Sequence, residues 1–73
     1  MDETGERAHL AQADKHIAAA KRHIARQKRV IADLERGAHE TDLAVSLLHA
    51  FEHTLHAFEQ HREVILVRLK MPD

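Results

Sequence analysis

Residues 43–65 read LAVSLLHAFEHTLHAFEQHREVI, and apolar side chains recur along this stretch at alternating spacings of four and three residues. This main line holds both phenylalanines of the protein, and only Arg62 interrupts it. The spacing predicts a helix whose apolar face is wider than the ~100° stripe that one packed neighbour covers. The main line is Ala44, Leu48, Phe51, Leu55, Phe58 and Ile65, and a second line beside it is Leu43, Leu47, Ala50, Ala57 and Val64. We therefore predict a helix with more than one packing partner.

A second heptad pattern lies earlier in the chain, between Arg7 and Arg36, where neither proline nor glycine occurs. Large and small side chains alternate along it, which lets a facing helix approach closely. About thirty residues at 1.5 Å each predict a rod roughly 45–50 Å long. The positions of this seam are Leu10, Ala13, Ile17, Ala20, Ile24, Gln27, Ile31 and Leu34.

Local signals place the ends of the first helix at about residues 5–36. Thr4 is suited to the N-cap position, and Gly37 can adopt the left-handed conformation that closes many helices. Thr41 then offers a new N-cap, so we predict a turn over residues 37–41.

The second helix is predicted at about residues 42–70. Asp42 places an acidic side chain in its first turn, while Arg68 and Lys70 suit its carboxyl end. Pro72 prevents the helix from continuing.

These elements predict an all-α fold, a coiled-coil-like antiparallel hairpin of two helices in one domain spanning residues 1–73. One continuous helix is the alternative, because a glycine inside a helix costs only about 1 kcal/mol. A turn centred near residue 39 gives a register that could shift by one layer. The expected pairs are Ile31 with Leu48, Gln27 with Phe51, Ile24 with Leu55, and Ala20 with Phe58.

Oligomerisation is expected because a 73-residue chain with twelve alanines, few aromatic residues and no cysteine builds only a thin core. A homodimeric four-helix bundle would bury both the second line of residues 43–65 and a row of alanines on the first helix. That row is Ala11, Ala18, Ala25 and Ala32. The predicted interface residues are Leu43, Leu47, Leu48, Phe51, Leu55, Phe58 and Ile65.

The chain has eight histidines, and three of them share one face of the second helix. His49, His53 and His56 are the candidate metal ligands, because side chains three or four residues apart on a helix can hold one divalent ion. This face is expected to point to solvent, which argues against an evolved site. We therefore predict no cofactor, and only weak and dispensable binding of Ni²⁺ or Zn²⁺ at these histidines.

Another set of histidines borders the seam. His9, His16 and His23 recur every seven residues on the first helix, and His61 lies on the apolar side of the second. We expect them to be half-buried packing residues. The alternative is a pH-responsive interface, because protonation would place charge in packed surroundings.

Between residues 15 and 29 there are six basic residues and no acidic one, whereas residues 38–73 carry a charge of −3. The basic side chains could contact a polyanion. The overall charge of −1 and the lack of aromatic residues nearby argue against nucleic acid and leave a protein partner. The candidate contacts are Lys15, Arg22, Arg26 and Arg29.

No catalytic residues are predicted, because the chain lacks cysteine, has a single serine and contains no glycine-rich loop. The acidic amino terminus precedes no apolar run, and no window approaches the ~20 apolar residues of a membrane span. We expect a cytoplasmic protein without membrane contact.

A broader pattern covers nearly the whole chain and resembles short uncharacterised bacterial helical-hairpin proteins. That resemblance implies a small helical hairpin and no transferable activity. We expect a non-enzymatic oligomerisation and protein-interaction module. The alternatives are a nucleic-acid-binding accessory protein and a histidine-rich metal-binding protein. The pattern consists of His16-Ile17, His23-Ile24, Gln27 and residues 30–37, then Leu47-Leu48, Phe51-Glu52, Leu55, Phe58 and His61-Arg62.

Overall fold

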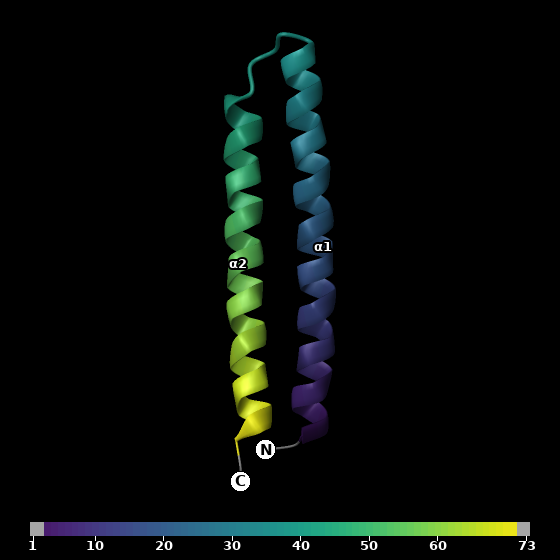
Figure 1. Cartoon of the computed structure of the whole chain (residues 1–73), viewed down its shortest axis with the longest axis vertical. Helices are drawn as coiled ribbons and strands as arrows, with labels where there is room; N and C mark the ends of the chain where they lie inside the picture. The colour runs from purple at the N-terminus through teal and green to yellow at the C-terminus, as the bar shows by residue number, and fades with distance from the viewer. Residues whose placement is uncertain (1–2, 72–73) are drawn as a thin grey trace.

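The computed structural model describes residues 3–71, with side chains described for residues 5–71. Over this range the chain forms two helices, α1 (Glu3–Arg36) and α2 (Asp42–Lys70), which pack against each other. They run antiparallel, and a short loop joins them at one end of the molecule (Figure 1). The predicted all-α two-helix architecture is confirmed, and the single continuous helix is not formed. Because α1 begins at Glu3, the predicted N-cap at Thr4 is wrong: Thr4 lies within the first turn.

The hairpin is a thin rod of 58 × 14 × 12 Å. Its radius of gyration is 16.9 Å, whereas a compact domain of this length has about 11 Å. Two long helices side by side cover each other along one seam only. Most of each helix surface therefore remains accessible.

The seam between α1 and α2 contains the side chains that the heptad spacing selects. All eight predicted α1 positions and all six α2 positions are half-buried or buried. Among the described side chains, however, the buried apolar residues are only Ala13, Ala20 and Ile65, and Ile65 alone is large. The remaining seam residues stay half-exposed because no further helix covers them within residues 3–71.

The register of the two helices is fixed by contacts across the seam. The Gln27 side-chain Nε2 donates a hydrogen bond to the Ala44 carbonyl at 2.9 Å. The His23 ring lies 5.7 Å from the Phe51 ring, and the His16 ring lies 5.1 Å from the Phe58 ring.

These contacts differ from the predicted pairs of Gln27 with Phe51 and Ala20 with Phe58. The register is displaced by about one layer, the shift left open by the sequence. The cause lies in the loop, which turns back alongside the end of α1, so that α2 starts below the last turn of α1 (Figure 1).

The loop closes α1 with a Schellman motif. The His39 amide donates to the Leu34 carbonyl at 2.9 Å, and the Ala38 amide donates to the Glu35 carbonyl at 3.0 Å. Ala38 carries the left-handed conformation, with φ of 60°, and Gly37 does not. The prediction for Gly37 is wrong by one residue, because the Gly37 amide still bonds the Asp33 carbonyl and continues the helix.

The two ends of α2 lie close to where the sequence predicts them. Thr41 occupies the N-cap of α2, but its side chain makes no capping hydrogen bond. Met71 follows the last residue of α2 and is extended, with φ −75° and ψ 133°. That conformation suits a residue that precedes a proline. Pro72, the predicted helix stop, lies outside the described residues.

Replacing Ala38 by glycine is predicted to stabilise the hairpin by about 0.5–1 kcal/mol, because glycine adopts positive φ without the steric penalty of a Cβ. The matched control is Ala25→Gly in the exposed middle of α1, which should destabilise by about 1 kcal/mol. Thermal melts followed by circular dichroism at one protein concentration measure both. Destabilisation by Ala38→Gly would contradict the left-handed assignment.

Candidate interaction surface

The main exposed feature is an apolar stripe on α2. Leu43 is 85% exposed and Met71 is 65% exposed, and the valines near the carboxyl end of α2 are about half exposed. The spacing of the predicted second line places its members along one side of the helix. All five are exposed, as expected for residues that the hairpin alone does not bury. The α2 stripe comprises Leu43, Leu47, Ala50, Ala57, Val64 and Met71.

Of the predicted interface residues, only part remains available to a partner. Leu43 and Leu47 are exposed. The other five are half-buried or buried in the seam against α1: Leu48, Phe51, Leu55, Phe58 and Ile65.

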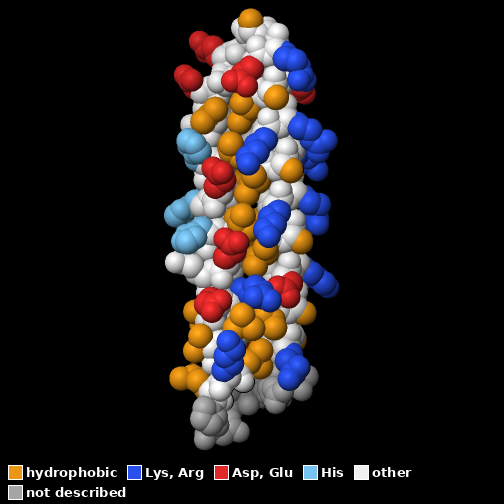
Figure 2. Space-filling model, viewed as in Figure 1, with side chains coloured by type: hydrophobic (Ala, Val, Ile, Leu, Met, Phe, Trp, Pro, Cys, Tyr) orange, Lys and Arg blue, Asp and Glu red, His pale blue; other side chains and the backbone are white. Residues whose placement is uncertain are grey.

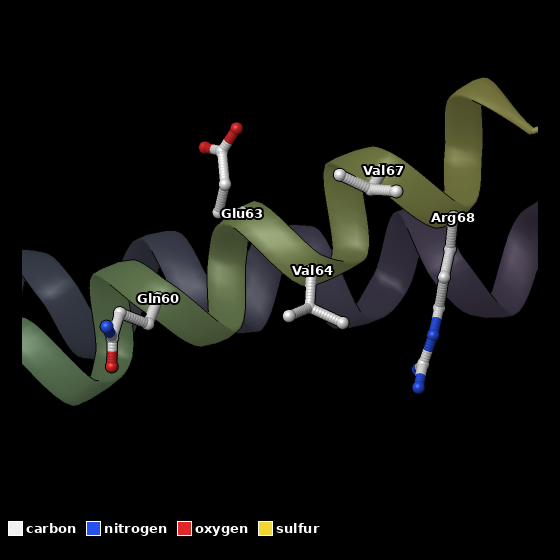
Figure 3. Close-up of a pocket in the computed structure, with 5 residues that line it drawn as sticks. All are labelled: Gln60, Glu63, Val64, Val67 and Arg68. Atoms are coloured by element: carbon white, nitrogen blue, oxygen red, sulfur yellow. The ribbon is translucent and has the colours of Figure 1, made fainter.

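A shallow depression lies toward the carboxyl end of α2, lined by Gln60, Glu63, Val64, Val67 and Arg68. All five come from this one helix, and Figure 3 shows their side chains spreading to different sides of it. Val64 and Arg68 project together, while Glu63 points the other way. A depression with walls from a single helix does not enclose a small molecule.

Two grooves follow the seam, and one of them is charged. We name it the charged groove. Arg62, which interrupts the apolar line, leaves the seam here and donates through Nε to Asp14 Oδ1 at 2.6 Å. The two side chains are 37% and 52% exposed, so the ion pair contributes only about 0.2–1 kcal/mol. The lining residues are Asp14, Ile17, Lys21, Glu59, Arg62 and Glu63.

The second groove is lined by apolar and imidazole side chains, and we name it the histidine groove. His16 and His23 from α1 each lie against a phenylalanine of α2. No lysine, arginine, aspartate or glutamate lines it. Its lining is His16, Ala19, Ala20, His23, Phe51, Thr54 and Phe58, and a smaller hollow beside it is lined by His9, Gln12, Ala13, His16 and His61.

The two grooves open on opposite faces of the hairpin. Lys21 lines the charged groove and His23 lines the histidine groove. These residues are two positions apart, and each position turns an α-helix by about 100°, so their side chains point about 200° apart around α1. In the view of Figure 2, acidic and basic side chains flank an apolar strip between the helices, and some of the histidine side chains lie along the α2 edge.

The histidines that border the seam are more exposed than predicted. His9, His16, His23 and His61 are all exposed. Their rings lie at the rim of the histidine groove, because the single hairpin provides nothing to cover it over the described residues. The expectation of half-buried packing residues is therefore wrong for the isolated chain, and a pH-responsive interface stays a prediction.

The geometry also separates two surfaces that the sequence analysis assigned to one interface. Ala18 and Ala25 lie three and four residues from Lys21, on the side of the charged groove. Leu47 lies four residues before Phe51, on the side of the histidine groove. A single flat interface cannot cover both the alanine row and the α2 stripe.

Glu6 is a buried residue that the sequence analysis did not select. Its side chain is 6% exposed, its Oε1 lies 4.0 Å from His9 Nδ1, and its Oε2 has no hydrogen-bond partner. The signal was present, because Glu6 lies four residues before Leu10 and seven before Ala13. The heptad line therefore extends to Glu6, and the spacing by itself indicates that this carboxylate faces the seam.

The basic residues proposed to contact a polyanion remain accessible on α1. Lys15, Arg22, Arg26 and Arg29 are all exposed. Blue side chains line the α1 edge in Figure 2. Arg36, at the end of this row, forms an ion pair with Asp33.

The candidate metal ligands do not come together with further ligands. His49, His53 and His56 are exposed on α2. Among the described residues, no three histidine, aspartate or glutamate side chains are arranged to hold a metal ion. Nor is any helix in this range long and apolar enough to cross a membrane.

Comparison with known proteins adds no relationship: no family model matches the chain, and no curated protein or solved structure matches it significantly.

Metal is predicted to be dispensable for the fold. Adding a chelator to protein produced without a histidine tag should change neither helix content nor melting temperature, because the three candidate ligands are solvated and lack enclosure. Circular dichroism with and without the chelator makes the comparison. A melting temperature several degrees lower in chelator would contradict this placement.

Proposed function

We propose that the protein is a non-enzymatic helical module that forms a homodimeric four-helix bundle and presents its outer faces to another protein. The observation that carries the proposal is the exposed apolar stripe of α2. Isolated exposed leucines are ordinary. A line of exposed apolar side chains on a helix that already packs one neighbour fits a second packing partner.

The surface area supports a partner of substantial size. The chain exposes 5,744 Å², whereas a compact monomer of its mass exposes about 4,600 Å². The excess of about 1,100 Å² exceeds the ~800 Å² that each partner contributes to a standard interface. One further copy of the hairpin is therefore enough to cover it.

The small core supports the same proposal. Only Ala13, Ala20 and Ile65 are buried apolar side chains within residues 5–71. Domains of this size seldom gain more than about 3–5 kcal/mol from one core, and disulfides are not available to a chain without cysteine. Association adds stability by mass action.

An interaction role is favoured over catalysis by the form of the surface. Both grooves lie open along the side of the rod, and the depression on α2 has walls from one helix. General acid–base catalysis depends on groups tuned by burial beside a bound substrate. Broad open faces of this kind suit a protein partner.

Light scattering or sedimentation equilibrium at micromolar concentration is predicted to give about twice the monomer mass, because the α2 stripe associates. The dimer should dissociate on dilution together with a falling melting temperature. A monomer that melts cooperatively, with a melting temperature independent of concentration, would refute the proposal.

The exposed basic row of α1 favours a second candidate, a nucleic-acid-binding accessory protein. Lys15, Arg22, Arg26 and Arg29 would then contact phosphates, and binding to duplex DNA would weaken steeply from 50 to 200 mM salt. The acidic residues of α2 and the charge of −1 oppose that candidate. Titration of labelled duplex at two salt concentrations distinguishes it from a protein-interaction module, which we expect to bind no duplex even at low salt.

A further inference from the structure

A homodimer of this hairpin has two distinct faces from which to choose its interface. The charged groove and the histidine groove lie about 200° apart around α1. A compact four-helix bundle places one of these faces at its centre and leaves the other in solvent. The composition of each face decides which of the two is buried at the lower cost in free energy.

Burying the charged groove would remove several ionic groups from water. Asp14, Lys21, Glu59, Arg62 and Glu63 all line it, and only the pair of Asp14 and Arg62 lies within bonding distance there. Desolvating each remaining charge costs several kcal/mol unless a partner compensates for it. The charged groove is therefore poorly suited to the centre of a bundle.

The histidine groove has the composition of an interface centre. Two phenylalanine rings and two alanines form its floor and wall, and the imidazoles and Thr54 supply the polar atoms. Interface centres are depleted of charged residues and enriched in aromatic ones. Because no lysine, arginine or carboxylate lines this groove, a two-fold axis can bring the same surface of two copies together without like-charge repulsion.

The α2 stripe continues the histidine groove. Leu47 lies four residues before Phe51 and seven before Thr54, so all three project from the same side of α2. Val30 continues the row of His16 and His23 on α1 and is 39% exposed. The groove and the stripe thus form one largely apolar face along the hairpin, with Arg26 and Arg68 at its border.

We propose that a second copy of the chain packs across the histidine groove, with Ala19 and Thr54 at the dimer interface and the charged groove facing solvent. This assignment rests on the proposed homodimer and specifies its interface. The accessible phenylalanine surface and the α2 stripe become the shared core of the bundle. The charged groove and Lys15, Arg22 and Arg29 of the basic row remain on the outside, available to a different protein; Arg26, seven residues after Ala19, borders the interface.

Single charge insertions test the face. Ala19→Glu on α1 and Thr54→Glu on α2 each place a carboxylate in the histidine groove of both copies. The matched control is Ala18→Glu, a neighbouring exposed alanine on the side of the charged groove. Sedimentation equilibrium measures the dimer dissociation constant, and circular dichroism measures helix content.

Both groove variants should weaken the dimer about 100-fold or more, because the buried carboxylates lose water and repel each other. Ala18→Glu should leave the dissociation constant within about threefold of the wild-type value. If Ala19→Glu loses its helix content, Thr54→Glu alone decides, since Thr54 is exposed in the hairpin.

The outcomes separate the two levels of the proposal. If Ala19→Glu and Thr54→Glu both leave the dimer associated but Ala18→Glu dissociates it, the proposed interface is wrong and the proposed homodimer still holds. A monomeric wild-type chain overturns the homodimer itself.

The pH dependence of the wild-type dimer gives a second measurement. His16, His23 and His61 line the groove region, and none of its lining residues from α1 or α2 is a carboxylate; His9 differs because it lies 4.0 Å from Glu6. A dimer that covers an imidazole disfavours its charged, protonated form. Protons then bind the open monomer in preference to the covered dimer, so the dissociation constant should rise at least tenfold at pH 5.5. A dissociation constant unchanged between these pH values overturns the assignment of the histidine groove.

Discussion

The single seam between α1 and α2 is the constraint on which this structure depends. Each helix of a larger bundle packs against two or more neighbours, whereas each helix of this hairpin has one. The seam closes around alanines, isoleucines and leucines, but its outer halves stay accessible, so that Ile65 is the one large side chain fully buried among the described residues. Half-buried phenylalanines follow from this geometry. They are placed at the rim of the seam, where a second hairpin can cover them.

Polar groups within the seam give it a direction and a register. Apolar heptads alone allow one helix to slide past another by a layer with little change in burial. The Gln27 side chain bonds the Ala44 carbonyl, and Arg62 reaches Asp14 on α1. Each of these bonds is satisfied in one register only, because a displacement of one layer, about 5 Å along the helix, breaks both. The two interruptions of the apolar pattern, one in each helix, therefore act as register markers.

The distribution of charge gives the two faces of the hairpin different properties. The ion pair of Asp14 with Arg62 and further charged side chains line one groove, and imidazole, phenylalanine and alanine side chains line the other. This separation arises because positions flanking the seam in a heptad fall on alternate sides of it. Lys21 lies two residues before His23, so the two side chains point to opposite faces of α1. The proposed homodimer would use the uncharged face and leave the charged face to another protein.

The sequence by itself determined the number of helices, their approximate ends and the residues that face the seam, because periodicity, glycine, threonine and proline act locally. It also predicted that the second line of α2 stays exposed in a single hairpin. The tertiary structure alone decided the register, since a repeating pattern does not specify which layer meets which, and the backward course of the loop sets the offset. It also decided that Ala38 takes the left-handed conformation, because α1 continues through the Gly37 amide before it ends. Finally, it placed the α2 stripe and the alanine row on opposite faces, a relation that depends on how two helices are rotated against each other and that neither helix encodes alone.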